Sequence, residues 1–264
     1  MTHVSYSELK IWKECPWKHK LVYLDKIKGF EGNEYTAFGT AIHSTYEKVL
    51  LKENIDEKDY FQNKFLEELK TLPEKVKNNL NKKLVEDLRK QGDTLASLSM
   101  DALKEYFGDF EVVSVEEQLY EPIKASLKKE YNFKGFIDLV LKTKDGNYHI
   151  IDWKTCSWGW DSRKKTDKMI TYQLTFYKYY FAIKHGLNPD KVETHFGLVK
   201  RTAKKNNVEI FRVTSGKKKT ENALKFLKKA LYNMNRNAYI KNKLSCHGRF
   251  GPCEFYNTKH CPQS

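Results

Sequence analysis

The chain has 264 residues, of which 40% are hydrophobic and 31% are charged, and its formal net charge is +14. This balance excludes a disordered chain, and because no long apolar stretch occurs we expect neither export nor a membrane span. The positive charge favours a polyanionic partner such as nucleic acid, although a solvated lysine-rich surface explains it equally well.

Helices are predicted through the first 107 residues. Ser5 is expected to cap the first helix, with Glu8 reaching back in a capping box, and the helix leads to Cys15-Pro16. A second helix is predicted from about Phe38 to Leu51 by its apolar spacing. Residues 56–107 are rich in Lys and Glu with recurring Leu and Phe, so we expect a helical insertion with solvated polar faces.

Strands are predicted after Gly108, where the apolar pattern changes. Asp145-Gly146 is a hairpin turn signal between two of them. The predicted strands cover residues 112–115, 118–123, 131–142, 148–153, 193–200 and 208–213, and the predicted helices cover 167–185 and 223–234. This order favours one α/β domain with a helical insertion over two independent domains.

Two aspartates and a lysine form the strongest local pattern. Asp138 and Asp152 lie inside apolar runs on strands joined by a tight turn, and Lys154 shares a strand face with Asp152. A carboxylate buried in such a run is costly unless a metal or a partner compensates its charge. Two carboxylates and a cation are the groups that metal-assisted phosphodiester hydrolysis needs. The alternative is a pair of strand-end aspartates beside a surface lysine.

Two helices carry further candidates. His43 follows Gly39 on a predicted helix, and a neutral imidazole can complete a metal site with two carboxylates. Gln173 and Tyr177 are four residues apart and share a helix face, where an amide and a phenol could contact a phosphate or a base. The alternatives are a structural histidine and an ordinary amphipathic helix.

These motifs, in this order, resemble the RecB-like branch of the PD-(D/E)xK nuclease superfamily. That branch includes the nuclease domains of RecB and AddB, CRISPR-adaptation exonucleases and phage-encoded relatives. The resemblance implies an α/β fold with a restriction-endonuclease-like core, a central mixed β-sheet flanked by helices, in a single nuclease domain over residues 1–264. The matching motifs are Ser5-Tyr6-Ser7 with Cys15-Pro16, Gly39-x-x-x-His43, Gly135-x-x-Asp138, Asp152-x-Lys154 and Gln173-x-x-x-Tyr177.

The resemblance also implies residue roles. His43, Asp138, Asp152 and the backbone carbonyl of Trp153 would bind Mg²⁺ or Mn²⁺, and Lys154 would orient or activate the attacking water. Asp152 stands where many members of the superfamily have Glu, a replacement that the RecB-like branch accepts.

DNA contacts are expected from several places. By the resemblance, Gln173 and Tyr177 would contact DNA, and Glu117 is a candidate for an additional carboxylate. A basic loop follows Trp158-Gly159-Trp160, and aromatic rings beside cations suit single-stranded DNA. The loop residues are Arg163, Lys164 and Lys165. Residues 201–243 carry thirteen Lys and Arg against two Glu, so much of the net charge lies there.

The cysteines suggest a second cofactor. Cys246, Cys253 and Cys261 fall within sixteen residues, and Cys15 lies far upstream. Four soft ligands from both ends of the chain suit a tetrahedral zinc or a [4Fe–4S] cluster. The resemblance implies a [4Fe–4S] cluster joining the N- and C-terminal regions, with zinc as the alternative and unligated thiols as a third interpretation. Cys156 is then a free thiol, and an odd number of cysteines favours a reducing cytoplasm over a secreted scaffold.

Together these features predict a metal-dependent deoxyribonuclease that hydrolyses phosphodiester bonds with a metal-bound water, an exonuclease on single-stranded DNA or duplex ends. The expected setting is recombination, repair, phage DNA processing or CRISPR adaptation, with a helicase, recombination or CRISPR-adaptation protein as partner. One alternative is a non-catalytic Fe–S DNA-binding subunit of a helicase–nuclease complex. Another is a structure-specific endonuclease.

Overall fold

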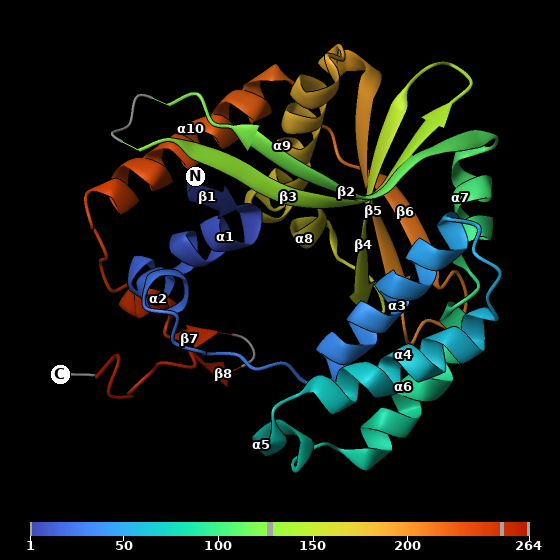
Figure 1. Cartoon of the computed structure of the whole chain (residues 1–264), viewed down its shortest axis with the longest axis horizontal. Helices are drawn as coiled ribbons and strands as arrows, with labels where there is room; N and C mark the ends of the chain where they lie inside the picture. The colour runs from blue at the N-terminus through green and yellow to red at the C-terminus, as the bar shows by residue number, and fades with distance from the viewer. Residues whose placement is uncertain (1, 126–128, 249–250, 263–264) are drawn as a thin grey trace. The chain divides into compact units, whose positions relative to one another are not determined.

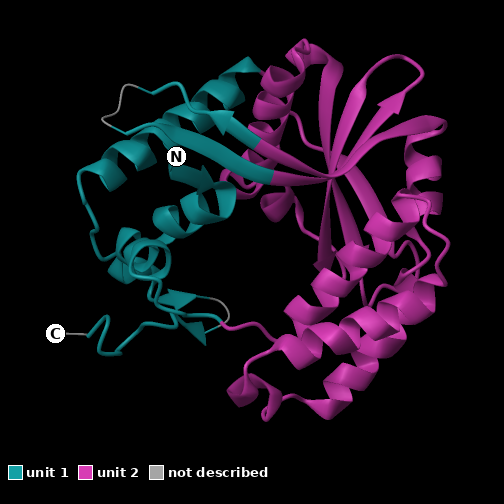
Figure 2. Cartoon of the chain, in the orientation of Figure 1, with its two compact units in different colours: residues 1–30, 120–135, 217–264 teal, residues 31–119, 136–216 magenta. Residues whose placement is uncertain are grey.

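The computed structural model describes residues 2–125, 129–248 and 251–262 and divides into two compact units (Figure 2). Unit 1 comprises residues 1–30, 120–135 and 217–264, and unit 2 comprises residues 31–119 and 136–216. Within the described part of the chain, no helix combines the length and the apolar character needed to cross a bilayer.

Unit 2 contains a helical region and most of the sheet (Figure 1). Its helices are α3 (Glu34–Leu50), α4 (Glu57–Thr71), α5 (Glu74–Lys77), α6 (Lys82–Leu95), α7 (Ser99–Phe107), α8 (Ser162–Thr166), α9 (Lys168–His185) and the 3₁₀ turn η2 (Pro189–Lys191). Its strands are β4 (Tyr148–Cys156), β5 (Val192–Lys200), β6 (Val208–Arg212) and most of β2 (Phe110–Pro122) and β3 (Tyr131–Thr143). The helices α4 to α7 occupy the region where the sequence predicts a helical insertion.

Unit 1 is built from both ends of the chain. Its elements are β1 (Thr2–Ser5), α1 (Tyr6–Glu14), α2 (Pro16–His19), the π-helical turn η1 (Lys20–Leu24), α10 (Lys217–Asn235), η3 (Lys243–Ser245), β7 (His247–Gly248) and β8 (Gly251–Pro252). Ser5 caps α1 by accepting a hydrogen bond from the Glu8 amide, as predicted. The Glu8 side chain does not complete a capping box, because it pairs with His19 at 2.8 Å instead.

The sheet is mixed, which confirms the predicted α/β class with a central sheet flanked by helices. Its hydrogen-bonded order is β1-β3-β4-β5-β6, and β2 also pairs with β3. The β3/β4 and β5/β6 pairs are antiparallel, while β1/β3 and β4/β5 are parallel. The parallel β4/β5 pair requires a crossover, and α8 and α9 supply it.

The side chains of β4 alternate between two environments. Ile151 and Trp153 belong to the apolar core that the sheet shares with α3, α4, α6 and α7. The Trp153 ring lies 5.1 Å from the Tyr46 ring of α3, centroid to centroid, in an edge-on arrangement. Asp152 and Lys154 therefore point to the opposite face, where α9 packs on β4 and β5. One face of β4 is therefore apolar, and the opposite face carries the charged side chains of Asp152 and Lys154.

Gly197 is expected to be essential for the packing of Trp153. The two residues pair across β5 and β4, and a Cβ added at Gly197 would lie 2.2 Å from the Trp153 ring. Because that ring is buried and held by Tyr46, we expect Gly197→Ala to lower the free energy of unfolding by about 1–3 kcal/mol. Urea denaturation would measure the loss. Gly216→Ala is the matched control, since nothing lies within 4 Å of its added Cβ, and an equal loss in both variants would contradict the argument.

Candidate active site

Asp138 and Asp152 lie on neighbouring strands of unit 2. Asp152 is 1% exposed, and Asp138 is half-buried. Asp138 Oδ2 accepts a hydrogen bond of 2.7 Å from the backbone amide of Trp153, which fixes the carboxylate against β4. The two carboxylates therefore lie near one another, and the negative charge of Asp138 raises the pKa of Asp152.

Lys154 and Gln173 hold the Asp152 carboxylate from two sides. The Lys154 ammonium forms an ion pair with Asp152 Oδ2. The Gln173 amide, on α9, donates to Asp152 Oδ1 at 2.8 Å and to the Tyr177 hydroxyl at 3.1 Å. The amide and phenol predicted to share a helix face thus do meet, and in this structure the amide contacts Asp152 directly.

His43, on helix α3, lies next to Asp138. Its Nδ1 lies 3.5 Å from Asp138 Oδ2, and its ring forms a hydrogen bond with the Trp153 backbone. The four groups that the resemblance implies as metal ligands, drawn from α3, β3 and β4, therefore gather in unit 2.

Burial shapes the ionisation of these groups. It raises the pKa of Asp152 to about 6, with Lys154 opposing the shift and Asp138 adding to it. It also raises the pKa of Asp138 and lowers the pKa of His43 to about 4, so the imidazole is neutral at pH 7. Two carboxylates, a carbonyl and a neutral imidazole are a donor set that Mg²⁺ or Mn²⁺ accepts, and a divalent cation among them would favour the ionised carboxylates. The residues present fit such an ion.

Glu117, which the sequence singles out as an additional carboxylate, makes other contacts, whereas the charges of Asp138 and Asp152 act on its neighbour Glu116. The Glu117 carboxylate binds Lys184 Nζ at 2.8 Å and His185 Nε2 at 2.6 Å. For Glu116, by contrast, burial and the negative charges of Asp138, Glu47 and Asp152 together raise the pKa to about 7. The backbone of Glu116 is left-handed, with φ of 49°, a conformation that is rare outside glycine and common at functional sites.

Glu117 is instead expected to stabilise the fold in a pH-dependent way. Burial would raise its pKa, but hydrogen bonds from Lys184, Ser114 and His185 outweigh burial and hold the pKa below its usual value. A lowered pKa means that this contribution is present above the unfolded-state pKa of about 4.3 and is lost as the pH falls through the folded-state value. We expect Glu117→Gln to cost about 1–2 kcal/mol of unfolding free energy at pH 7.

Urea denaturation at pH 7 and again near the unfolded-state pKa would test the Glu117 effect. The difference between parent and Glu117→Gln should shrink at the lower pH. Glu111→Gln is the control, because Glu111 is an exposed carboxylate on the same strand, β2. A loss that does not change with pH would assign the effect of the substitution to packing.

The predicted basic loop is a short helix, α8, next to exposed aromatic side chains. Lys164 Nζ lies 4.5 Å from the centre of the Trp160 ring, and Trp158 is 75% exposed. Lys165 forms an ion pair with Glu209 and lies 4.8 Å from the centre of the Phe211 ring. Cations and aromatic faces therefore occur together on this part of unit 2, as the sequence predicts.

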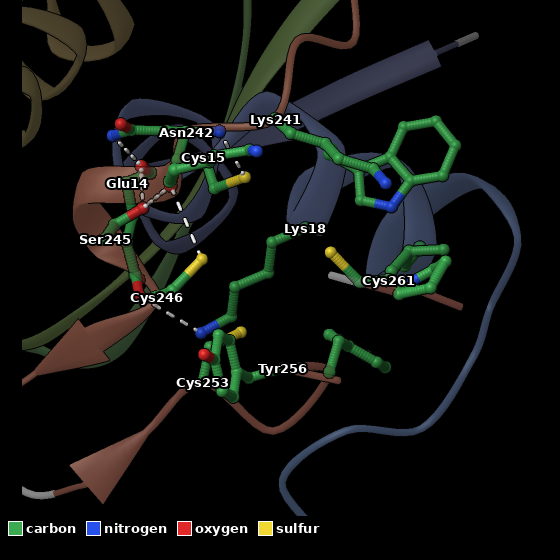
Figure 3. Close-up of a pocket in the computed structure, with 15 residues that line it drawn as sticks. Glu14, Cys15, Lys18, Lys241, Asn242, Ser245, Cys246, Cys253, Tyr256 and Cys261 are labelled. Atoms are coloured by element: carbon green, nitrogen blue, oxygen red, sulfur yellow. Dashed lines mark hydrogen bonds and ion pairs between the residues drawn. The ribbon is translucent and has the colours of Figure 1, made fainter. Parts of the chain in front are cut away.

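Four of the five cysteines line one pocket of about 220 Å³ in unit 1. They are Cys15, Cys246, Cys253 and Cys261, and Figure 3 shows the Lys18 side chain between their sulfurs. Hydrogen bonds tie the two chain ends together there: the Asn242 side chain donates to Glu14 O at 2.8 Å, and Trp17 Nε1 donates to His260 O at 3.0 Å. Within residues 2–125, 129–248 and 251–262, no three cysteine sulfurs lie within 4.8 Å of one another.

A different cluster was missed by the sequence analysis. His149, Glu193 and His195 place three potential metal-ligand atoms within 4.8 Å of one another, and this is the one such group found among the described residues. Alternation along residues 193–195 could have suggested that Glu193 and His195 share a strand face. No pattern in the sequence, however, indicates that Glu193 and His195 lie next to His149.

Comparisons with known proteins point to one family. The sequence matches the PD-(D/E)XK nuclease superfamily over residues 3–262. The crystal structure of a protein from Eubacterium rectale, described as a "putative exonuclease", is similar with a TM-score of 0.54 at 12% identity, over 90% of this chain and 83% of that one. A second solved structure, SSO0001, gives a TM-score of 0.36 at 13% identity, over 86% of this chain and 85% of that one. No curated protein matches.

Proposed function

Because the chain belongs to the PD-(D/E)XK nuclease superfamily, we propose that it is a Mg²⁺- or Mn²⁺-dependent DNA exonuclease acting on single strands or duplex ends. The proposal treats the whole chain as one nuclease domain with its helical insertion at α4 to α7. The observation that carries it is the convergence of His43, Asp138, Asp152 and Lys154 within unit 2.

The carboxylates are proposed to hold the metal. Asp138 and Asp152, with His43 and the Trp153 carbonyl, would be its ligands, and Glu116 would supply a further negative charge next to them. A bound Mg²⁺ or Mn²⁺ would act as a Lewis acid on the phosphate and lower the pKa of the attacking water. The Trp153 amide and Gln173 keep the two carboxylates in place through their hydrogen bonds.

Lys154 is proposed to act on the phosphate and the nucleophile. Burial alone would lower the pKa of Lys154, but Asp152 and Asp138 outweigh it and raise the pKa, so the side chain is an ammonium at pH 7. An ammonium in a partly desolvated site stabilises the negative charge that develops on the phosphate during in-line attack. It can also orient the attacking water by a hydrogen bond.

Single-stranded DNA is proposed to bind along the aromatic and basic side chains of unit 2. Trp158 and Trp160 offer faces on which bases stack, while Arg163, Lys164 and Lys165 pair with phosphates. Gln173 and Tyr177 lie at the carboxylates, where the scissile phosphate would be. Trimming of DNA ends is a step common to recombination, repair, phage DNA processing and CRISPR adaptation, and a helicase or recombination partner would deliver such ends.

The cysteine pocket is proposed to hold a [4Fe–4S] cluster. A volume of about 220 Å³ exceeds that of several water molecules, at about 30 Å³ each, and is far larger than one zinc ion requires. Zinc with four thiolates would also bring the sulfurs to within about 4 Å of one another. Lys18 lies among the four sulfurs, where its ammonium pairs with Glu14 at 3.3 Å and with Glu254 at 3.0 Å.

Digestion of end-labelled linear and circular single-stranded DNA with Mn²⁺ tests the proposed activity. An exonuclease degrades the linear strand and leaves the circle intact. Cleavage of the circle or of branched DNA would instead identify an endonuclease. Salt-dependent DNA binding without cleavage of any substrate would identify a non-catalytic DNA-binding subunit.

A further inference from the structure

His149, Glu193 and His195 lie at the starts of two adjacent parallel strands. His149 pairs with Glu193, and His195 pairs with Ile151 two residues along β4. Because strand side chains alternate, these three lie on the face of Trp153, opposite to Asp152 and Lys154. Both histidines are buried, with 7% and 2% of their surfaces exposed, and Glu193 is half-buried. The cluster is therefore separate from the proposed nuclease site.

The spacing of the three ligand atoms suits a single metal ion. His149 Nδ1 lies 3.2 Å from His195 Nε2, and Glu193 Oε2 lies 3.7 Å and 3.8 Å from these two nitrogens. Tetrahedral zinc, with bonds of about 2.0–2.1 Å to nitrogen and oxygen, separates its ligand atoms by about 3.3–3.4 Å. From this geometry we propose that His149, Glu193 and His195 form a second metal site, for a divalent transition metal such as Zn²⁺.

Thr143 sets the tautomer that a metal requires. The Thr143 hydroxyl donates its one proton to Asp145 Oδ1 at 2.5 Å, so it can only accept from His149 Nε2, which lies 2.9 Å away. His149 Nε2 therefore carries the ring proton, and Nδ1 presents its lone pair to His195 and Glu193. Metal-binding histidines typically donate their second ring N–H to such a partner.

Arg212 orients the carboxylate. Its guanidinium lies 2.8 Å from Glu193 Oε1, which leaves Oε2 directed at the two imidazoles. Two imidazoles and a carboxylate are ligands that zinc accepts, and thiolates are not needed.

The site is open on one side. All three residues line a pocket of about 600 Å³, together with Tyr106 and Phe107 at the end of α7. The Phe107 ring lies 5.0 Å from the His195 ring and 4.8 Å from the His149 ring, centroid to centroid. Three protein ligands with an accessible fourth position leave room for water or a small anion on the metal. The metal would also join β4 and β5 beneath α7.

Metal analysis after equilibrium dialysis against Zn²⁺ tests the site. We expect His195→Gln and Glu193→Gln each to hold about one zinc fewer per chain than the parent protein, because each removes one of three ligands. His185→Gln is the control, since His185 is an exposed histidine of the same unit outside the cluster. The cysteines and the nuclease site are intact in all three variants, so the difference reports this site alone. Melting curves of the variants without metal show whether each still folds.

Two further measurements sharpen the assignment. Co²⁺ at this site should give visible ligand-field bands without thiolate charge transfer, and His195→Gln should lose those bands. Thr143→Val should weaken zinc binding about 10–100-fold, while Thr143→Ser, which keeps the hydroxyl, should bind as the parent does. Equal zinc content and affinity in the parent, His195→Gln and Glu193→Gln would overturn the proposal. The two imidazoles would then be only a hydrogen-bonded pair in the core.

Discussion

Lys154→Ala is expected to lower the rate of DNA cleavage by about 10²–10³-fold while leaving Mn²⁺ binding intact. The ammonium lies against Asp152 and within the field of Asp138, and it is the cation that these carboxylates keep charged. Its removal takes away stabilisation of the phosphate charge in the transition state without removing a metal ligand. Single-turnover cleavage of an end-labelled strand at saturating Mn²⁺ would measure the loss.

Lys142→Ala is the matched control for Lys154. Lys142 is another half-buried lysine of the same sheet, on β3, where its ammonium lies 5.3 Å from the centre of the Tyr148 ring. We expect this variant to cleave DNA at the parent rate. Asp152→Asn should lose cleavage together with Mn²⁺ binding, which separates a ligand from a residue that acts on the phosphate. If Lys154→Ala cuts as fast as the parent, the proposed role of Lys154 is wrong.

Those parts of the fold that depend on local pattern could be predicted from the sequence. The hairpin of β3 and β4 follows from two apolar runs around Asp145-Gly146, and its pairing brings Asp138 near Asp152. The strand β1 could not be predicted, because four residues carry too little periodicity. Its pairing partner, β3, begins at Tyr131, which is 126 residues after β1 ends at Ser5.

Two features of the candidate sites could not be predicted from the sequence either. The sequence singles out Glu117 as an additional carboxylate on a predicted strand, but it does not show that the neighbouring Glu116 has a left-handed backbone. Phe110 and Val112 of β2 pack on the core, and so does Val115, so the inward-facing positions change from even to odd numbers between Val112 and Val115, and Leu119 keeps the new parity. Such a change of parity comes from the backbone and leaves no sign in residue types. The meeting of His149 with His195 likewise depends on the register of β4 and β5, which the α9 crossover sets.

Cys253→Ser is expected to remove the iron and the brown colour of protein prepared without oxygen. Cys253 lines the pocket with Cys15, Cys246 and Cys261, and a cluster that loses one of four thiolates is no longer fully ligated. Iron and sulfide analysis with visible spectroscopy would measure the loss. Cys156→Ser is the control, because Cys156 belongs to unit 2 and does not line this pocket. It should keep the iron content of the parent.

Loss of the cluster should also loosen both ends of unit 1. A cluster bound only by the folded state adds its binding free energy to folding, and the cysteine ligands come from both ends of the chain. We therefore expect proteolysis of Cys253→Ser to begin near Asn242 and the α1/α2 junction, where hydrogen bonds hold the ends together. If the parent protein is colourless and carries one zinc ion, the cysteines bind zinc in place of the [4Fe–4S] cluster, and zinc is then the cross-link between the two ends. Equal protease resistance of Cys253→Ser and Cys156→Ser would show that hydrogen bonding and packing alone hold the two ends.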